Sequence, residues 1–552
     1  MVNIPVMRKG NSRVAGHRLS RQHFLSLLAV LGACAFARIW LIVHTDVIAR
    51  DGVTYVRMAQ DWLDSPRRVV DAYDYHVGYP AVLAGMHRLV FWLGGPAGIV
   101  GWDLAGQLVS LVASLAAMVA VWLFAAMAFN RRLAWITTLL FGVGRNWAVL
   151  GADVLSDAPA VCLAMWAMVF ALWTLALIQR RSKWAVALAS VVGFCAGVGY
   201  LFRPEALLVA VLAIGLWLAY QAWSRVSWPL TLASAAAALL WTAACAASYA
   251  IAIGGLSKKK SLSEIIPVVR DAAPTGVIAV VEAGMPDLAL REVIAEGFEA
   301  MHPIVATLAC VWLVTWVGAR VLRLNLPKRV CIFPRGPAAF LMVAATLTVV
   351  IMLIGLHLHV HYVSCRHLMF LAALLSPLGG AGVAIGGRWL SLFAEKLGRR
   401  RIRDGLFSSL IALGLAAGLL GHTLRPLHKD KACYRETGLF LGRTAGPEDF
   451  IVADRIQILH YAQRPGAFVP RAMAGRPELV EYIRRTAATY VALTGEAHGQ
   501  ENGPLAEALR RPPFILMRQF GQAGAERDRT VYLYKFDPEG GGSRVRSDSD
   551  RP

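Results

Sequence analysis

Acidic, aromatic and basic side chains crowd into one short stretch that follows a long apolar run. The stretch covers residues 46–80, DVIARDGVTYVRMAQDWLDSPRRVVDAYDYHVGYP, with Asp51 and Tyr55 near its start and His76 and Tyr79 at its end. Carboxylates beside a bilayer are costly to keep, so a chain that gathers several of them is expected to use some for function. A carboxylate can take the proton of a reacting hydroxyl as a general base. This stretch is therefore a candidate for the acidic half of a catalytic site.

A second carboxylate and two arginines stand at the ends of other apolar runs. Asp157 opens one run in the sequence LSDAP, Arg203 closes another in FRPE, and Arg366 precedes a late one. Each has an ordinary structural alternative, because a carboxylate at a helix start caps the helix and an arginine at a helix end reaches lipid headgroups. Guanidinium groups also bind phosphate through charge-assisted hydrogen bonds. Both interpretations stay open for these residues and for Asp51.

Four histidines before the late apolar run raise the question of a metal site. They are His357, His359, His361 and His367. Alternate spacing at a helix end does not set the geometry of metal ligands, so a metal role is the less favoured interpretation. The eight cysteines are scattered without C-x-x-C spacing and mostly lie inside apolar runs, which indicates neither a disulfide framework nor a zinc site. Whether a divalent metal takes part stays open.

The composition is that of a polytopic membrane protein. Of the 552 residues 57% are hydrophobic and 16% charged, and the mean hydropathy is +0.53. A soluble chain of this length needs more charge to cover its surface. The net charge of +21 could indicate nucleic-acid binding. However, the basic residues form short clusters between apolar runs, which is typical of cytoplasmic loops and disfavours that function.

Eleven apolar runs are long enough to cross a bilayer, which takes about 20 residues. They lie at 24–44, 103–128, 133–150, 158–178, 184–201, 206–223, 228–251, 303–320, 337–357, 367–386 and 405–424. The shorter run 79–93 carries His87 and Arg88, and we expect a helix at the membrane surface there rather than a twelfth span. A cleavable lipoprotein signal ending at Cys34 is the less favoured alternative to an uncleaved first span.

The basic loops set the expected orientation. With eleven spans the clusters 131–132, 180–183 and 399–401 fall on the same side as the basic tail 1–23, which the positive-inside rule makes the cytoplasm. A twelfth span at 79–93 would place the first two clusters outside. With eleven spans, the polar residues around Asp51, Asp157, Arg203 and Arg366 all emerge on the outer face. So do the loop 254–303 and everything after residue 425.

The composition changes after the last span. The segments 450–453, 490–493, 514–517 and 531–534 are predicted strands, and 477–485 and 505–510 are predicted helices between them. We therefore expect a membrane domain at 24–425 and a small extracytoplasmic α/β domain at 426–537, which is large enough for its own core. The Gly- and Ser-rich tail 538–552 is expected to be disordered.

The order of the short motifs resembles the polyprenyl-phosphate-sugar-dependent glycosyltransferases of the GT-C fold. This group includes the protein mannosyltransferase and aminoarabinose transferase types, glycosyltransferase families 39 and 83. The motifs are RDG with a tyrosine at 50–55, H-x-G-Y-P at 76–80, LSD at 155–157, FRPE at 202–205 and RH at 366–367. The resemblance covers about residues 24–390. It implies a GT-C-like membrane domain in a bacterial inner membrane, with a C-terminal domain like the outer-face domains of many members.

The same resemblance implies an activity and roles for particular residues. The enzyme would transfer a monosaccharide from a polyprenyl-phosphate-linked donor to a lipid, glycan or protein acceptor. Asp51 would be the catalytic carboxylate, with Asp157 assisting. The substrate-binding residues would be Tyr55, His76, Tyr79, Arg203, Glu205, His361 and Arg366, with Arg203 and Arg366 on the donor's phosphate. The family often has an adjacent acidic pair where Asp51 stands between Arg50 and Gly52, and a tyrosine where His367 stands.

The chemistry agrees with this resemblance. Transfer from a lipid phosphate needs a base for the acceptor's proton and positive charge for the departing phosphate. The isoprenoid tail needs an apolar groove that opens to lipid. Two other functions fit the composition: a transporter or lipid flippase, and a membrane scaffold that presents the α/β domain. A transporter would carry polar residues deep within several spans, whereas these spans are largely free of acids.

Overall fold

The computed structural model describes residues 21–258, 286–321, 334, 336–360, 364–397, 404–469, 473–498, 503–521 and 529–537. Most of the predicted basic tail, more than half of the predicted loop 254–303 and the predicted tail 538–552 lie outside these residues. The chain divides into two compact units. The first comprises Met1–Val43, Tyr55–Gly94 and Leu104–Arg425, and the second comprises His44–Thr54, Gly95–Asp103 and Pro426–Pro552.

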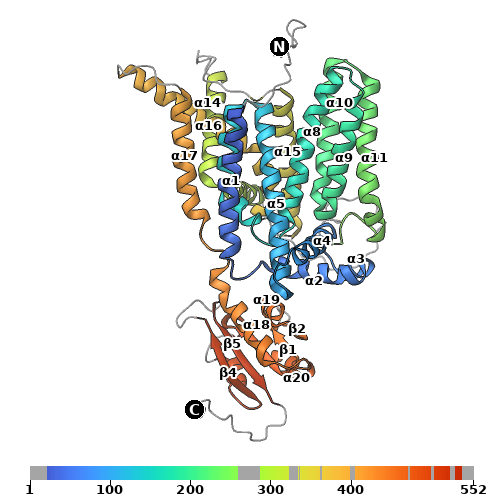
Figure 1. Cartoon of the computed structure of the whole chain (residues 1–552), viewed down its shortest axis with the longest axis vertical. Helices are drawn as coiled ribbons and strands as arrows, with labels where there is room; N and C mark the ends of the chain where they lie inside the picture. The colour runs from blue at the N-terminus through green and yellow to red at the C-terminus, as the bar shows by residue number, and fades with distance from the viewer. Residues whose placement is uncertain are drawn as a thin grey trace. The chain divides into compact units, whose positions relative to one another are not determined.

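The first unit is a bundle of long apolar helices (Figure 1). Its long helices are α1 (Arg21–Val43), α5 (Gly98–Ala128), α8 (Asp157–Gln179), α9 (Trp184–Phe202), α10 (Leu207–Ser224), α11 (Trp228–Ala252), α14 (Pro303–Val321), α15 (Gly336–Val360), α16 (Met369–Lys396) and α17 (Asp404–Thr423). Within the described residues, nine helices are long and apolar enough to cross a membrane. The count is ten if α13 (Pro286–Met301) and α14, which meet at a 108° bend, form one span. Large apolar side chains such as Trp223 and Ile251 are exposed, as a lipid-facing surface requires.

The structure does not show the single spanning helix that was predicted at 133–150. This run forms two helices, α6 (Arg131–Gly142) and α7 (Arg145–Leu150), of 12 and 6 residues, so neither alone reaches across a bilayer. The sequence Gly142-Val143-Gly144 separates them. A Cβ atom on Gly142 would lie 2.3 Å from Met118 Cε, so the missing side chain lets α5 pack against the end of α6. An average hydropathy over the whole run does not reveal this break between two short helices.

The predicted polar loop 46–80 is mostly helical. It contains α2 (Arg50–Asp64) and α3 (Pro66–Ala72), and α4 (Gly78–Trp92) follows. Ser65 caps α3 by accepting a hydrogen bond from the Arg68 amide, and Pro66 supplies a suitable first residue. Helix α4 has 15 residues and is not among the candidate spans, in line with the surface helix expected at 79–93. Figure 1 shows α3 and α4 near the lower ends of α9 and α11.

The second unit is built on a five-stranded mixed sheet of order β2-β1-β3-β5-β4. The parallel strands are β1 (Ile451–Ala453), β2 (Gly466–Phe468) and β3 (Tyr490–Thr494), and Val452 pairs with both Ala467 and Val491. Strand β5 (Val531–Phe536) runs antiparallel to β3 and to β4 (Phe514–Phe520). Each of the four predicted strands overlaps an observed one. The short edge strand β2 is additional.

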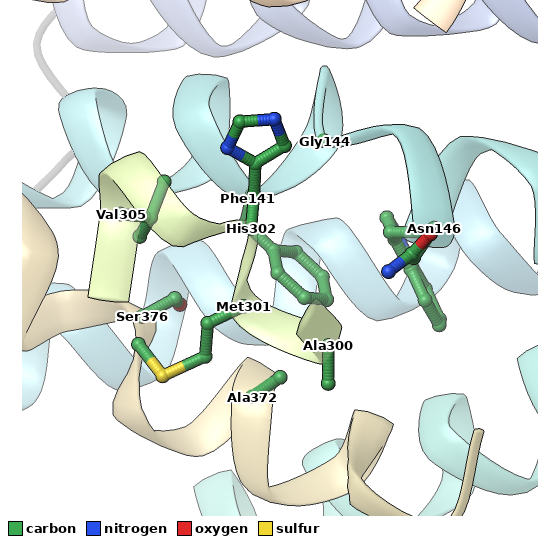
Figure 2. Close-up of a pocket in the computed structure, with 10 residues that line it drawn as sticks. Phe141, Gly144, Asn146, Ala300, Met301, His302, Val305, Ala372 and Ser376 are labelled. Carbon is green, nitrogen blue, oxygen red and sulfur yellow. The ribbon is translucent and has the colours of Figure 1, made fainter. Parts of the chain in front are cut away.

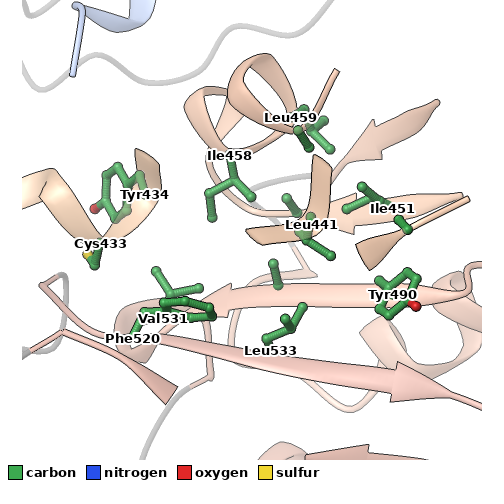
Figure 3. Close-up of a cluster of buried hydrophobic side chains, with 14 residues drawn as sticks. Cys433, Tyr434, Leu441, Ile451, Ile458, Leu459, Tyr490, Phe520, Val531 and Leu533 are labelled. Carbon is green, nitrogen blue, oxygen red and sulfur yellow. The ribbon is translucent and has the colours of Figure 1, made fainter. Parts of the chain in front are cut away.

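Helices cover both faces of this sheet. Ile451 of β1 packs in a cluster with α18 (Ala432–Thr444) and α19 (Ile456–Ala462), which Figure 3 shows from the side. Its neighbour Val452 packs in a second cluster with α20 (Glu478–Arg485) and α22 (Pro504–Leu509). Successive side chains of a strand point to opposite faces, so both faces of β1 are buried. The α/β fold class predicted for the C-terminal domain is confirmed.

Candidate active site

One buried carboxylate holds two arginines in the first unit. Asp157, the first residue of α8, has a side chain that is 1% exposed. Arg203, which follows α9, places Nη1 3.2 Å from Asp157 Oδ1. Arg366, in the short helix η2 (Cys365–Leu368), places Nη2 2.7 Å from Oδ2 and donates a second hydrogen bond from Nε at 3.3 Å. We call these three residues the ion triad.

A narrow cavity adjoins the ion triad. Its volume is about 50 Å³. The polar lining comprises Asp157, Arg203, Glu205, Arg366 and His367, and the apolar lining comprises Ala160, Val161, Ala164, Ala206, Leu208, Val209, Val349, Met352 and Phe370 from α8, α10, α15, α16 and the turn before α10. A polar end with two guanidinium groups beside an apolar remainder suits a phosphate joined to a hydrocarbon chain. Sites that hold small molecules usually measure about 300–1,000 Å³, so the cavity must widen to take one.

Glu205 is the second carboxylate of the cavity. It lies in the helix η1 (Pro204–Ala206), directly after Arg203. Its Oε2 atom is buried and has no hydrogen-bond partner among the described residues. A buried acceptor without a partner is unfavourable, so Glu205 is suited to receive a hydrogen bond from a ligand hydroxyl.

Local capping fixes the orientation of Arg366. The Ser364 hydroxyl accepts a hydrogen bond from the Arg366 amide at 3.2 Å, and the Ser364 amide donates to His367 Nδ1 at 3.3 Å. This reciprocal arrangement is a capping box, which satisfies amides at the start of a helix. His367 therefore helps to hold the helical turn that carries Arg366.

Tyr55 connects α2 to the residue before Asp157. Its hydroxyl lies 2.9 Å from Ser156 Oγ, and its ring packs on Tyr79, with the ring centres 5.0 Å apart. Tyr79 itself is fully buried and donates its hydroxyl hydrogen to the Gly106 carbonyl at 2.8 Å. Both tyrosines thus hold α2 and α4 against α5 and the start of α8. Their predicted contacts with substrate stay predictions.

The other residues of the H-x-G-Y-P motif pack against α9 and α11. The His76 ring lies 5.2 Å from Tyr200 and 5.3 Å from Tyr249, measured between ring centres, and the residue is 8% exposed. At Gly78 a Cβ atom would come within 2.7 Å of the Leu201 carbonyl carbon, so only glycine fits this approach. The motif therefore fixes the start of α4 beside the end of α9, the helix that Arg203 follows.

The remaining predicted residues are placed as follows. Asp51 lies in the first turn of α2 and belongs to the second compact unit, whereas Asp157 belongs to the first. The predicted cavity shared by these two carboxylates stays a prediction. His361 lies outside the described residues. In the part of the chain that the structure describes, no group of three or more His, Cys, Asp and Glu side chains could hold a metal ion.

A side-chain hydrogen bond joins α2 to the residue that follows α3. The Tyr73 hydroxyl donates to Asp61 Oδ2 at 2.7 Å. Burial, together with this hydrogen bond and the nearby carboxylate charge, raises the pKa of Tyr73 to about 12. Lys258 donates hydrogen bonds to the carbonyls of Val70, Asp71 and Tyr73. Lys258 thus stabilises the carboxyl end of α3.

Sequence reasoning missed Arg38, which lies within the first predicted span. Its side chain is fully buried, and it donates hydrogen bonds to Ser114 Oγ and to the carbonyls of Cys34 and Gly142, at 2.9, 2.9 and 3.1 Å. These partners tie α1 to α5 and α6. The available signal was a charged residue inside an otherwise apolar run, since such residues normally have specific partners.

A much smaller cavity lies at the bend between α13 and α14 (Figure 2). Its volume is about 10 Å³, and His302 is the only titratable residue of its lining. Asn146 donates a hydrogen bond to the Glu299 carbonyl there at 2.7 Å. A space of this size holds at most about one water molecule, so we assign it no catalytic role.

Comparison with known proteins shows which families and folds the chain resembles. Residues 99–248 match the model of the dolichyl-phosphate-mannose-protein mannosyltransferase family. Among solved structures, ArnT from Cupriavidus metallidurans in the apo state has a TM-score of 0.55 at 12% identity, over 94% of this chain and 99% of that chain. ArnT bound to undecaprenyl phosphate has a TM-score of 0.53 at 13% identity, over 95% and 100%. No curated protein matches the sequence closely enough to count as a relative.

The likeness extends to a larger enzyme. The apo oligosaccharyltransferase of Archaeoglobus fulgidus has a TM-score of 0.51 at 13% identity, over 92% of this chain and 76% of that chain. At such identities the likeness shows a shared fold, which is the GT-C fold of membrane glycosyltransferases. The family model matches about a quarter of the chain, nearly all of it within the first unit. The GT-C-like fold that the short motifs implied is confirmed.

Proposed function

We propose that the protein transfers a monosaccharide from a polyprenyl-phosphate-linked donor to a lipid, glycan or protein acceptor on the outer face of a bacterial inner membrane. The observation that carries this proposal is the ion triad at the polar end of an otherwise apolar cavity. The matching family is one of lipid-phosphate-sugar-dependent enzymes, and ArnT has been solved with undecaprenyl phosphate bound. Both support a polyprenyl phosphate as the carrier.

In the proposed reaction the acceptor hydroxyl loses its proton to the Asp51 carboxylate while its oxygen attacks the anomeric carbon. The bond between that carbon and the phosphate oxygen breaks, and its electron pair leaves with the polyprenyl phosphate. Arg203 and Arg366 stabilise the charge on the departing phosphate. Asp157 assists by holding both guanidinium groups at the cavity. Glu205 accepts a hydrogen bond from a hydroxyl of the donor sugar.

The proposal is tested with purified protein in lipid nanodiscs. The protein is incubated with a panel of undecaprenyl-phosphate-linked hexoses and pentoses, and released undecaprenyl phosphate is measured by mass spectrometry. We expect release with at least one donor. Asp51→Asn should abolish release while the protein stays folded, because an amide cannot accept the proton. Turnover retained in that variant would remove Asp51 from the mechanism.

Arg203→Ala tests the phosphate contact. We expect a raised apparent donor KM because one of the two guanidinium groups is lost. An unchanged donor KM would mean that Arg203 pairs with Asp157 without contacting the donor phosphate. The matched control is Arg67→Ala, since the Arg67 side chain is 93% exposed and pairs only loosely with Asp71, at 4.0 Å. This control variant should release lipid phosphate at the rate of the unmodified protein.

A further inference from the structure

A cavity in the second unit lies where its three parallel strands end. Its volume is about 370 Å³. The lining comes from the residues at and after the carboxyl ends of β1, β2 and β3, among them Arg455, Phe468 and Glu496. Helix α19, after β1, packs on one face of the sheet, and α20, after β2, packs on the other. Open α/β sheets bind ligands at this kind of reversal, beyond the carboxyl ends of the strands.

One wall of this cavity is a row of alternating charges. Arg455 pairs with Glu496 through Nη2 and lies 3.7 Å from Asp454 Oδ2 through Nε. Asp454 is 6% exposed and accepts hydrogen bonds from the amide and the hydroxyl of Thr494. Thr494 belongs to β3, so the sheet itself fixes the row. The Glu496 side chain is 68% exposed and is free to contact a ligand.

The rest of the lining includes aromatic and apolar residues. The guanidinium group of Arg50 lies over the Phe468 ring, 5.4 Å from its centre. Val469, Ile456 and Ala497 add apolar surface, and the Gln457 amide adds a further donor and acceptor. Arg50 and Asp51 are consecutive residues of the first turn of α2. The cavity is therefore lined by a direct chain neighbour of the carboxylate proposed as the base.

We propose that this cavity binds a sugar residue of the acceptor. A volume of about 370 Å³ lies at the lower end of the range for small-molecule sites, about 300–1,000 Å³. Two arginines and two carboxylates balance in charge, which disfavours a simple anion or cation. Ion pairs in the wall disfavour a purely apolar ligand, since those groups would lose water without gaining partners. A neutral polyhydroxylated ligand uses both donors and acceptors, and its ring carbons pack on apolar surface.

The assignment of this sugar to the acceptor rests on the proposed function, whereas binding itself does not. The test uses the full chain in nanodiscs without any donor. The probes are the methyl glycosides of glucose, galactose, mannose and arabinose, and binding is read by saturation-transfer NMR. We expect at least one glycoside to bind. Glu496→Gln should weaken its binding about tenfold, because a hydrogen bond to a charged carboxylate becomes one to a neutral amide.

The matched control is Glu507→Gln. Glu507 is a similarly exposed glutamate of the second unit that also pairs with an arginine, Arg511, but it does not line the cavity. This variant should bind the glycoside as the unmodified protein does. Inorganic phosphate serves as the competing probe. Displacement of every glycoside by millimolar phosphate would identify an anion site and overturn the proposal, and so would the absence of binding by all four glycosides.

Steady-state kinetics can distinguish a failure of this inference from a failure of the proposed function. Once an acceptor is found, Glu496→Gln should raise the acceptor KM and leave the donor KM unchanged. An unaltered acceptor KM in an active variant would refute the acceptor assignment while the glycosyltransferase activity stands. The converse result is also informative. The protein could bind a glycoside, lose that binding on Glu496→Gln, and yet release no lipid phosphate. The sugar site would then stand, and the proposed activity would be refuted.

Discussion

The two arginines of the ion triad hold Asp157 in different ways. Arg366 approaches one carboxylate oxygen with two nitrogen atoms, whereas Arg203 approaches the other oxygen with one. A planar guanidinium group can keep one N–H on the carboxylate and turn others toward a phosphate. A lysine ammonium group is a point charge and cannot reproduce that fork. The geometry at Arg366 therefore matters in addition to its charge.

This difference predicts the effect of Arg366→Lys. The substitution keeps the positive charge but removes the fork, so we expect kcat/KM for the donor to fall about tenfold, and Arg366→Ala to lower it further. Initial rates of lipid-phosphate release measure both variants. Arg67→Lys, at an exposed site, is the control. Equal rates for Arg366→Lys and the unmodified protein would show that charge alone suffices.

Single residues were predictable from the sequence only as a set of candidates. Asp157, Arg203 and Arg366 each stand at the end of an apolar run, which is where polar residues of a membrane protein reach water. Their pairing depends on how the spans pack, and three short motifs far apart in the chain do not specify that packing. The caps at His367 and Ser364 likewise appear only once the helical turn around Arg366 is known.

Among the elements, α1 depends on the one buried charge within it. Arg38→Met keeps a long side chain but removes the donors to Ser114 and Gly142. We expect a loss of roughly 2 kcal/mol or more in the free energy of unfolding, because buried acceptors lose their partner. Thermal unfolding in detergent measures it. Ile39→Met, at a half-exposed neighbour on the same helix, is the control and should unfold at the original temperature.

Helix α19 holds the two short segments that belong to the second unit. His460 Nε2 lies 2.9 Å from Asp103 Oδ1, and the Ile48 amide donates to the Tyr461 hydroxyl at 3.3 Å. We expect a double-mutant cycle of His460→Ala and Asp103→Asn to give a coupling energy of about 1–2 kcal/mol, as for other hydrogen-bonded pairs that include a charged group. Unfolding in urea measures each variant. Additive losses would mean that the two residues stabilise the unit independently.

The elements show where pattern reading succeeds and where it stops. Strands β3, β4 and β5 have five to seven residues rich in β-branched and aromatic side chains, and they were predicted. Strand β2 has three residues, Gly-Ala-Phe, which carry no such signal. The run 133–150 is mostly apolar, but it forms two short helices that are separated at Val143-Gly144. Hydropathy reports which residues avoid water and gives no information about how tightly helices approach.

At the scale of the whole molecule, the distribution of basic loops predicts the orientation in the membrane. We expect the N-terminus in the cytoplasm and the C-terminal domain outside it. Alkaline phosphatase fused after residue 552 should be active in a bacterial host, because that enzyme needs the oxidising outer compartment. Green fluorescent protein at the same position should remain dark. Fluorescence from the second fusion would show that the C-terminus lies in the cytoplasm. That result would contradict the expected orientation and exclude Asp51 from chemistry on the outer face.

The overall class was predictable because composition and long apolar runs depend little on packing detail. They indicate a helical membrane domain and an appended α/β domain, and the GT-C fold agrees with both. The number of crossings was harder to predict, since 133–150 forms two short helices and 303–317 joins α13 at a sharp bend. Both exceptions occur where a predicted span is interrupted. A hydropathy value averaged over about 20 residues does not show such a short interruption.

The ion triad also joins neighbouring helix ends, because Asp157 begins α8, Arg203 follows α9 and Arg366 lies directly before α16. We expect the phosphate of the proposed donor to draw Arg203 and Arg366 away from Asp157, which would let the helices separate as the narrow cavity fills. In this proposal the phosphate both opens the cavity and serves as the leaving group. A sugar joined to an uncharged polyprenol would leave both arginines paired with Asp157. We therefore expect the cavity to stay narrow and such a molecule not to act as a donor.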